Sequence, residues 1–275
     1  MSPNPSYPIH PYGFIIAGAS LRHLPAMYDG VFNAETYLET LERSIKESVP
    51  TPVALIVSFP SNPTAQIVSI EFYKELVKIA LKYRVYILSD LAYAEIYYDG
   101  IVPPSILQVP RAKEIAVEFT SMSKTYAMAG WRIGFAVGNI KLINALTRIK
   151  SYLDYGAFTP VQVAAATALN GPQDCVLEIR KTYQKRRDTL IKSMSRSGWD
   201  IPSPPASMFA WAPLPKKYKN KGSLEFAKEL MLKADVAVAP GVAFGEYGEG
   251  FVRVGLVENE QRIKQAAKNI KKLLL

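Results

Sequence analysis

Blocks of apolar residues alternate with longer amphipathic stretches over the first two thirds of the chain. The apolar blocks are rich in β-branched residues, which is typical of buried strands. The strand candidates are residues 54–60, 85–90, 116–123 and 133–138. The helix candidates, with apolar residues at helical spacing, are residues 71–84, 140–153, 160–170 and about 174–197. Because strands that alternate with helices form layered structures, this pattern favours an α/β fold with a largely parallel sheet.

The pattern changes after Gly198, where short strand candidates are separated by two helices. These strand candidates are residues 207–214, 236–241 and 251–256. The last stretch of the chain is an amphipathic helix with an apolar stripe that includes Ile263 and Ile270. We expect a large α/β domain over residues 1–185 and a smaller C-terminal α+β domain over residues 186–275. The Pro-rich start, residues 1–13, predicts a loop.

Composition restricts the protein class. Of the 275 residues, 49% are apolar, which is enough for a sizeable core. No apolar run is long enough to span a bilayer and no signal peptide is evident, so we expect no membrane partner. The single cysteine, Cys175, excludes an internal disulfide framework and a Cys-rich metal site. We therefore expect a cytoplasmic protein without a bound metal.

The formal net charge is +9, which is compatible with a nucleic-acid partner or with small acidic ligands. Lysines gather at 216–221 and on the polar side of the C-terminal helix, where a solvated helix face explains them. The chain has no RNA-binding aromatic signature, zinc-finger spacing or heptad array. The sequence thus favours small acidic ligands and no nucleic-acid partner.

Polar residues follow three of the predicted strands at the point where each strand ends. Asn62 follows the first strand, Asp90 and Tyr93 the second, and Ser121, Ser123 and Lys124 the third. Since ligands in open α/β sheets bind at the carboxyl ends of strands, these side chains would share one edge. Each also has an ordinary alternative role, such as a helix cap for Asp90 or a turn for Asn62. Lys124 could be a surface lysine, and Arg132 an ion-pair partner.

Together, these residue types suit pyridoxal phosphate (PLP). An amine such as Lys124 can form a Schiff base with its aldehyde, and a buried carboxylate such as Asp90 can keep its ring nitrogen protonated. Tyr93 and Asn62 can donate hydrogen bonds to its phenolic oxygen. The hydroxyl and cationic groups that suit its phosphate are Ser121, Ser123 and Arg132.

The chain resembles the PLP-dependent aminotransferases of fold type I, classes I and II. The segments that carry the resemblance are residues 5–10, 61–64, 90–93, 121–132 and 251–255. Within that family it is most similar to the alanine (glutamate–pyruvate) aminotransferase branch, through residues 150–169, 222–230 and 254–266. The resemblance implies a homodimer that moves an amino group between an L-amino acid, alanine or glutamate, and a 2-oxo acid.

The resemblance also implies a role for individual residues. Lys124 would be the Schiff-base lysine and would move the substrate Cα proton, while Asp90 pairs with the pyridine nitrogen. Tyr7 would stack on the cofactor ring. Arg253 would bind the substrate carboxylate beside Asn62; from the residues alone it is only a charge on an edge strand.

Two features depart from the family pattern. The family has a long segment before the position of Pro5, which supplies part of the large domain and phosphate contacts, and this sequence begins after it. Ala65 stands where the family often has Gly, and a turn with positive φ would resist Ala. The first departure leaves an alternative hypothesis: an impaired or inactive remnant of the fold that acts at most as a binding or assembly partner.

Overall fold

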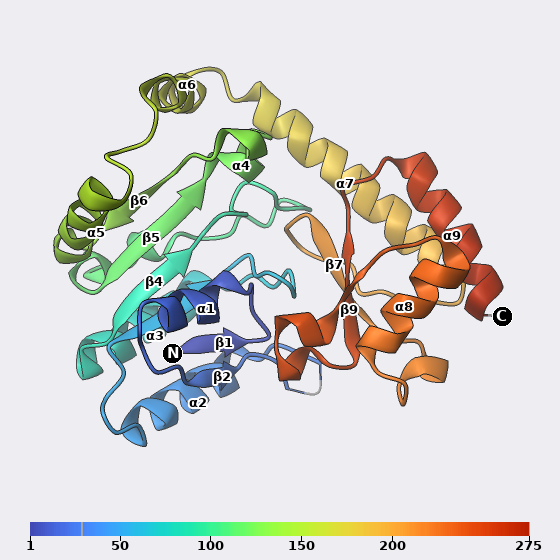
Figure 1. Ribbon diagram of the computed structural model, residues 1–275, viewed down its shortest axis with the longest axis horizontal. Helices are drawn as coiled ribbons and strands as arrows, with labels where there is room; N and C mark the ends of the chain where they lie inside the picture. Colours follow the sequence, from blue (N-terminus) through green and yellow to red (C-terminus); the bar gives the residue numbers. More distant parts are fainter. Residues whose placement is uncertain (29, 275) are drawn as a thin grey trace. The chain divides into compact units, whose positions relative to one another are not determined.

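Four of the strands that the sequence predicts pair into one sheet in the computed structural model, which describes residues 1–28 and 30–274 (Figure 1). The strands are β3 (Ala54–Ser58), β4 (Tyr86–Asp90), β5 (Ala116–Ser121) and β6 (Gly134–Gly138). They lie in the order β3-β4-β5-β6. The β3–β4 and β4–β5 pairs are parallel and the β5–β6 pair is antiparallel. The expected α/β class with a mixed, mostly parallel sheet is confirmed.

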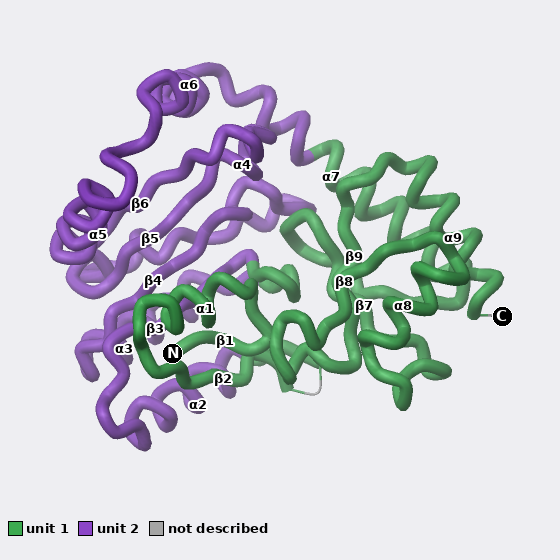
Figure 2. The backbone as a smooth tube through the Cα atoms, viewed as in Figure 1, with its two compact units in different colours: residues 1–33, 61–66, 181–275 green, residues 34–60, 67–180 purple. Residues whose placement is uncertain are grey.

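The described residues divide into two compact units, coloured separately in Figure 2. Unit 1 comprises residues 1–33, 61–66 and 181–275, and unit 2 comprises residues 34–60 and 67–180. The division into domains of residues 1–185 and 186–275 stays a prediction. The compact units differ from it because residues 1–33 and 61–66 belong with the C-terminal part of the chain.

The helices predicted at residues 71–84, 140–153, 160–170 and about 174–197 are present, whereas two further helices, at residues 34–46 and 122–125, were not predicted. The helices of unit 2 are α2 (Ala34–Lys46), α3 (Ile70–Tyr83), α4 (Met122–Thr125), α5 (Ile140–Leu153) and α6 (Thr159–Asn170), followed by α7 (Asp174–Ser195), which continues into unit 1. In α3 the Ser69 hydroxyl caps the first turn by accepting the N–H of Phe72 at 3.3 Å. Its buried face includes Phe72, Leu76 and Val77, and Arg84 ends it in the left-handed conformation. No described helix is long and apolar enough to cross a membrane.

Unit 1 contains the predicted C-terminal sheet. Its strands are β7 (Phe209–Pro213), β8 (Ala239–Pro240) and β9 (Phe251–Gly255), in the antiparallel order β7-β9-β8. The helix α8 (Ser223–Ala234) separates β7 from β8, and two short 3-10 helices, η5 (Gly241–Phe244) and η6 (Glu246–Gly248), separate β8 from β9. A core that includes Leu190, Phe226, Val252 and Ile263 joins this sheet to α7, α8 and α9 (Glu260–Leu274).

The expectation of a loop at the start of the chain is wrong. Residues 2–4 form β1 (Ser2–Asn4), which pairs in parallel with β2 (His23–Pro25), and α1 (Ile9–Ile16) follows. Pro8 directly precedes α1 and Pro11 lies in its first turn. Proline is tolerated there because the first N–H groups of a helix have no intrahelical partner.

One carboxylate is buried inside unit 2. Glu118 of β5 is only 6% exposed, and it accepts hydrogen bonds from the hydroxyl of Ser105 at 2.6 Å and the N–H of Ile106 at 3.1 Å. Burial raises the pKa of Glu118, while the bonds from Ser105, Ile106 and Ser89 oppose that rise. Glu118 therefore ties the loop after β4 to the sheet.

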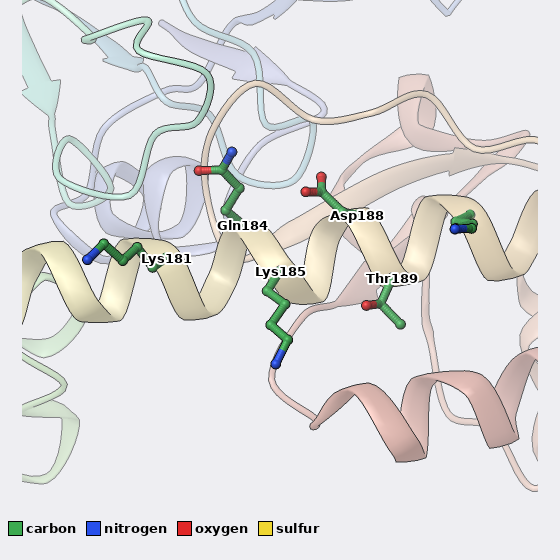
Figure 3. Close-up of a pocket in the computed structure, with 6 residues that line it drawn as sticks. Lys181, Gln184, Lys185, Asp188 and Thr189 are labelled. Atoms are coloured by element: carbon green, nitrogen blue, oxygen red, sulfur yellow. The ribbon is translucent and has the colours of Figure 1, made fainter.

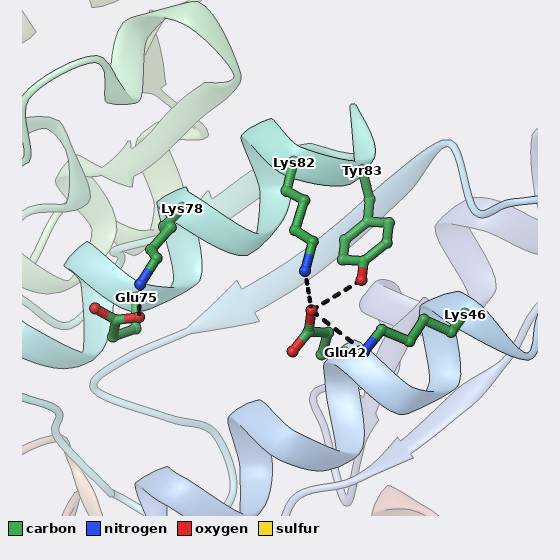
Figure 4. A network of polar contacts seen from close by, with 6 residues as sticks. All are labelled: Glu42, Lys46, Glu75, Lys78, Lys82 and Tyr83. Atoms are coloured by element: carbon green, nitrogen blue, oxygen red, sulfur yellow. Dashed lines mark hydrogen bonds and ion pairs between the residues drawn. The ribbon is translucent and has the colours of Figure 1, made fainter.

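A second polar network joins α2 to α3 at the surface of unit 2 (Figure 4). Oε1 of Glu42 accepts hydrogen bonds from Lys82 Nζ and from the Tyr83 hydroxyl, each at 2.8 Å, and Lys46 Nζ lies 3.6 Å away. The bonds from Lys82 and Tyr83 lower the pKa of Glu42 from 4.5 to about 2. The ionised carboxylate is thus the form that connects the two helices.

Replacing Arg84 by glycine is expected to stabilise the protein. Arg84 is exposed and has φ 56° at the C-terminus of α3, a conformation that a side chain resists and glycine adopts freely. We expect Arg84→Gly to raise the free energy of unfolding by about 0.5–1 kcal/mol in urea titrations. Arg84→Ala is the control and should leave it unchanged; equal stability of all three proteins would contradict this account.

The Glu42 network predicts a specific loss of stability in acid. The folded-state pKa of Glu42 is depressed, so its contribution is present above pH 4.5 and is lost as the pH falls toward about 2. We expect Glu42→Gln to lower the Tm near neutral pH. Between neutral pH and pH about 3, the Tm of this variant should fall by less than the Tm of the unmodified protein. Equal acid-induced drops in both proteins would show that Glu42 does not carry this dependence.

Candidate functional site

The carboxyl ends of three neighbouring strands bring polar residues to one edge of the sheet in unit 2. Asp90 is the last residue of β4 and pairs in register with Ser58 of β3 and Phe119 of β5. Ser121 ends β5, and since β6 is antiparallel, its first residue, Gly134, pairs with Ser121. Residues from the end of β3 to the start of β6 therefore share this edge.

The lysine singled out by the sequence lies on the short helix that leaves this edge. Ser121 is the N-cap of α4, and its hydroxyl accepts the N–H of Ser123 at 3.2 Å. Lys124 is half-buried on α4, and its Nζ lies 6.0 Å from the centroid of the Tyr93 ring. Asp90 Oδ1 accepts the N–H of Ala92 at 3.0 Å, which orients the turn that leads to Tyr93. The structure thus brings Lys124 and Tyr93 together beside the end of β4.

Arg132 is placed differently from the serines that were grouped with it. It is exposed, has φ 54° at the end of the 3-10 helix η3 (Ala129–Trp131), and its Nη1 donates to the carbonyl of Ala129 at 3.2 Å. Two residues later, Gly134 pairs with Ser121, which sets Arg132 at the same edge of the sheet. Ser123 is buried.

Tyr7, Asn62 and Arg253 belong to unit 1. Nη1 of Arg253 donates to Oδ1 of Asn62 at 2.7 Å. The Cζ atom of Arg253 also lies 4.7 Å from the ring centroid of Phe244 and 4.9 Å from that of Phe209. Tyr7 is 44% exposed and makes an edge contact with His10. Asn62 and Arg253 are therefore in direct contact, and Tyr7 lies on a separate segment of the same unit.

The description of Arg253 as an edge-strand charge is wrong. β9 is the central strand of its sheet, with β7 on one side and β8 on the other. Arg253 is opposite Trp211 of β7 and Ala239 of β8 in the two registers. A charge on a central strand needs partners, and Asn62 and the two phenylalanine rings provide them.

The loop that carries Asn62 is held by its own polar groups. The Ser61 hydroxyl is 2.5 Å from the Thr64 hydroxyl and accepts the N–H of Gln66 at 2.8 Å. Ala65 has φ 57° and is completely buried. The turn therefore does have positive φ, as the resemblance to the family implied, and here it accommodates alanine.

Unit 2 contains a cavity that is lined partly by α4. It is lined by the apolar side chains of Met122, Phe135 and Leu177 and by the hydroxyl-bearing residues Thr120 and Thr125. Four of its polar residues form two pairs. Tyr126 donates to Gln173 at 2.8 Å, and burial raises the pKa of Tyr126, while the bond to Gln173 opposes that rise. Arg180 Nη2 is 3.0 Å from Glu95 Oε2, and its Cζ lies 3.7 Å from the Tyr97 ring centroid.

A second depression lies in unit 1, on the surface of α7 alone (Figure 3). Lys181, Gln184, Lys185, Asp188 and Thr189 project from the one helix in different directions. The residues that line the depression all belong to α7, and Lys185 Nζ is already 3.8 Å from Glu260 Oε1 of α9. This depression has none of the geometry of a catalytic site.

The chemistry of the unit 2 edge fits PLP. It offers a primary amine on Lys124, a carboxylate on Asp90, and hydroxyls on Ser121 and Ser123, which are the groups the cofactor requires. An observation that sequence reasoning missed supports the fit: the Ser58 hydroxyl is buried and has no hydrogen-bond partner among the described residues. It stands in register with Asp90, and its position as the last residue of β3 was the signal that could have found it.

Comparisons with known proteins agree with this chemistry. A family model described as aminotransferase class I and II matches residues 1–270. The chain is 55% identical to the Rhizobium meliloti protein AatC, covering 100% of this chain and 66% of that protein. It is 54% identical to the glutamate-pyruvate aminotransferase AlaC of Escherichia coli, covering 98% of this chain and 64% of that protein. The chain therefore spans slightly less than two thirds of the length of these relatives.

Solved structures show the same fold. An aromatic aminotransferase from Pyrococcus horikoshii matches with a TM-score of 0.91 and 26% identity, covering 99% of this chain and 72% of that chain. A mutant aspartate aminotransferase from Thermus thermophilus matches with a TM-score of 0.88 and 25% identity, with the same coverage of 99% and 72%. The aspartate aminotransferase-like fold expected from the sequence is confirmed.

The cap of α4 predicts a measurable loss of stability. Ser121→Ala removes the hydroxyl that accepts the Ser123 N–H, so we expect the free energy of unfolding to fall by about 1 kcal/mol in urea titrations. Ser121→Asp keeps an acceptor at the cap and serves as the control, with stability near that of the unmodified protein. An alanine variant as stable as the aspartate variant would refute the capping role.

Proposed function

Because the chain belongs to the class I and II aminotransferase family, which uses PLP, we propose that it binds PLP and transfers an amino group from an L-amino acid to a 2-oxo acid. The observation that carries this proposal is the position of Lys124 beside Tyr93, on the helix that leaves the sheet edge formed by Asp90 and Ser121. When bound, PLP acts as an electron sink that stabilises negative charge at the substrate Cα.

We assign the acid–base work to residues of unit 2. Lys124 Nζ would hold the aldehyde end of the cofactor, and as a free amine it would carry the proton from the substrate Cα to C4′ of the cofactor. The Asp90 carboxylate keeps a proton on the ring nitrogen, and Ser58 lies in register beside it. The Tyr93 hydroxyl donates to the phenolic oxygen. Ser121, Ser123 and Arg132 bind the phosphate.

We assign substrate binding to residues of unit 1. Arg253 binds the carboxylate of the amino acid or oxo acid, because a planar guanidinium matches a carboxylate in a bidentate pair. Asn62 accepts one N–H of Arg253 and so limits the rotation of the guanidinium. Its amide N–H would donate to the phenolic oxygen of the cofactor. Tyr7 stacks on the cofactor ring.

Alanine and glutamate are the proposed amino donors. The similarity to the glutamate-pyruvate aminotransferase AlaC supports this choice. Arg253 by itself accounts only for recognition of a carboxylate, which all amino acids share. The choice of donor therefore rests on the relative, and a screen of amino acids with pyruvate and 2-oxoglutarate as acceptors would test it.

We further propose a homodimer in the cytoplasm. Exposed apolar side chains on α5, α6 and the segment between them support self-association, because such surface is costly to leave in water. They include Ile149, Leu153, Phe158 and Val163. The single cysteine, Cys175, which is free and exposed, agrees with a reducing compartment.

PLP uptake gives the direct test of the function. Added PLP should produce a visible absorption band, and borohydride reduction should fix the cofactor covalently to the peptide that contains Lys124. Lys124→Ala should abolish both the covalent label and transamination between alanine and 2-oxoglutarate.

Lys141→Ala is the matched control, since Lys141 is an exposed lysine of α5 in the same unit. It should keep the absorption band, the label and the activity. A Lys124→Ala variant that retains the label and turnover would refute the assignment. A well-folded protein that takes up no PLP would favour the alternative of an inactive member of the fold.

A further inference from the structure

We propose that Phe244 is a positioning residue of the carboxylate-binding site, whose ring holds the Arg253 guanidinium and whose backbone anchors the segment that carries Tyr7. The inference rests on the proposed role of Arg253 in binding the substrate carboxylate. Phe244 ends the 3-10 helix η5 and is only 8% exposed. No sequence motif pointed to it.

The ring contact is the first part of the argument. Cζ of Arg253 lies 4.7 Å from the centroid of the Phe244 ring, and the ring of Phe209 lies at 4.9 Å. Both distances are within the range of a cation–π interaction, which is stronger when water is excluded. Since a carboxylate pairs with a guanidinium in the guanidinium plane, two rings close to Cζ and Asn62 at one N–H group restrict the direction from which a carboxylate can approach.

The backbone of the same turn provides the second part. The carbonyl of Phe244 accepts the N–H of Ser6 at 2.9 Å, directly before Tyr7. The N–H of Tyr247 donates to the Asn4 side chain at 3.3 Å. Gly245 has φ 121°, and a Cβ there would overlap the Asn4 side chain. The turn therefore anchors the segment of Tyr7 with its backbone and holds Arg253 with a side chain.

The turn itself is held firmly. The N–H of Val242 donates to the Ser223 hydroxyl at 3.2 Å, at the start of α8. A Cβ on Gly241 would overlap the carbonyl oxygens of Gly248 and Phe251, so the turn closes on itself at a distance that only glycine permits. A ring carried on such a turn has a defined position, which is what a positioning residue requires.

Phe244 also packs against Trp211 and Met27, so a purely structural role must be distinguished from positioning. The probe is propionate, a carboxylate with no amino group, and its dissociation constant is measured by ligand-observed NMR on the complete chain without PLP. This measurement does not require transamination. Every variant is first checked for folding by its urea unfolding curve.

Phe244→Leu removes the ring but keeps the backbone hydrogen bond to Ser6. We expect the dissociation constant of propionate to rise about tenfold, the scale of a partly desolvated cation–π contact. Phe244→Tyr keeps the ring and should bind within about twofold of the unmodified protein. Phe244→Met, which fills a similar volume without a ring, should behave like Phe244→Leu and replaces it if that variant does not fold.

Phe226→Leu is the matched control. Phe226 is a completely buried ring of the same unit that packs against Trp199 and Tyr218 in the core beside α8. It should lower stability and leave propionate binding unchanged. In the PLP-loaded protein, Phe244→Leu should raise KM for both substrates while kcat stays the same, because the carboxylate is held equally in the ground state and the transition state.

The outcomes separate the two proposals. If Arg253→Ala abolishes propionate binding but Phe244→Leu and Phe244→Met bind like the unmodified protein, Phe244 is only a core residue and the inference is overturned. If Arg253→Ala has no effect, the carboxylate role of Arg253 falls and the inference falls with it. If propionate binding depends on both Arg253 and Phe244 but the protein cannot transaminate, the inference is supported and the proposed function is overturned.

Discussion

The parallel pairing of β3, β4 and β5 is the constraint on which the arrangement of the candidate site depends. Parallel neighbours need a crossover connection, and here α3 and the loop after β4 provide it. Their carboxyl ends consequently meet at one edge, where Ser58, Asp90 and Ser121 gather from distant parts of the chain. The antiparallel return of β6 then brings the stretch after η3 to the same edge. The site is therefore a consequence of sheet topology before any side-chain contact is considered.

The two units solve the problem of buried polar groups in different ways. In unit 2, Glu118 is compensated by hydroxyl and backbone donors, and its raised pKa shows that burial still outweighs them. In unit 1, Arg253 has an amide oxygen and aromatic rings as partners. Aromatic faces attract a guanidinium without neutralising its charge, so this setting holds a cation that remains able to attract an anion. A carboxylate partner in place of Asn62 would have neutralised that charge.

The similarity to aminotransferases and the geometry within each unit are consistent with each other. The family match extends over residues 1–270 and therefore includes both units. Within unit 2 the amine, phenol and carboxylate are brought to one edge, and within unit 1 the amide and guanidinium are in contact. The relatives are longer than this chain, which spans 66% of one and 64% of another. Activity is therefore a property to be measured on this chain itself.

The sequence by itself determined the local elements and the types of residue available for chemistry. The β-branched runs around 54–60 and 116–123 became strands, and 140–153 became a helix, because periodicity reports which face of an element is buried. It also indicated the polar strand ends, from which Asp90 and Lys124 could be selected. The loop predicted for residues 1–13 was wrong because the prolines were taken as a sign of a loop, although the first turn of a helix accepts proline.

Only the tertiary structure decided which other residues lie beside the candidate site residues. The central position of β9 and the rings of Phe209 and Phe244 beside Arg253 leave no local pattern in the sequence. The same holds for the Ser58 hydroxyl, which has no hydrogen-bond partner in the part of the chain that the structure describes. Phe244 lies 182 residues after Asn62 in the chain, yet both contact Arg253. Contacts between residues so far apart in the sequence are set by the order of the strands and the path of the chain between them. These depend on the free energy of the whole fold and not on the secondary-structure propensity of any one segment.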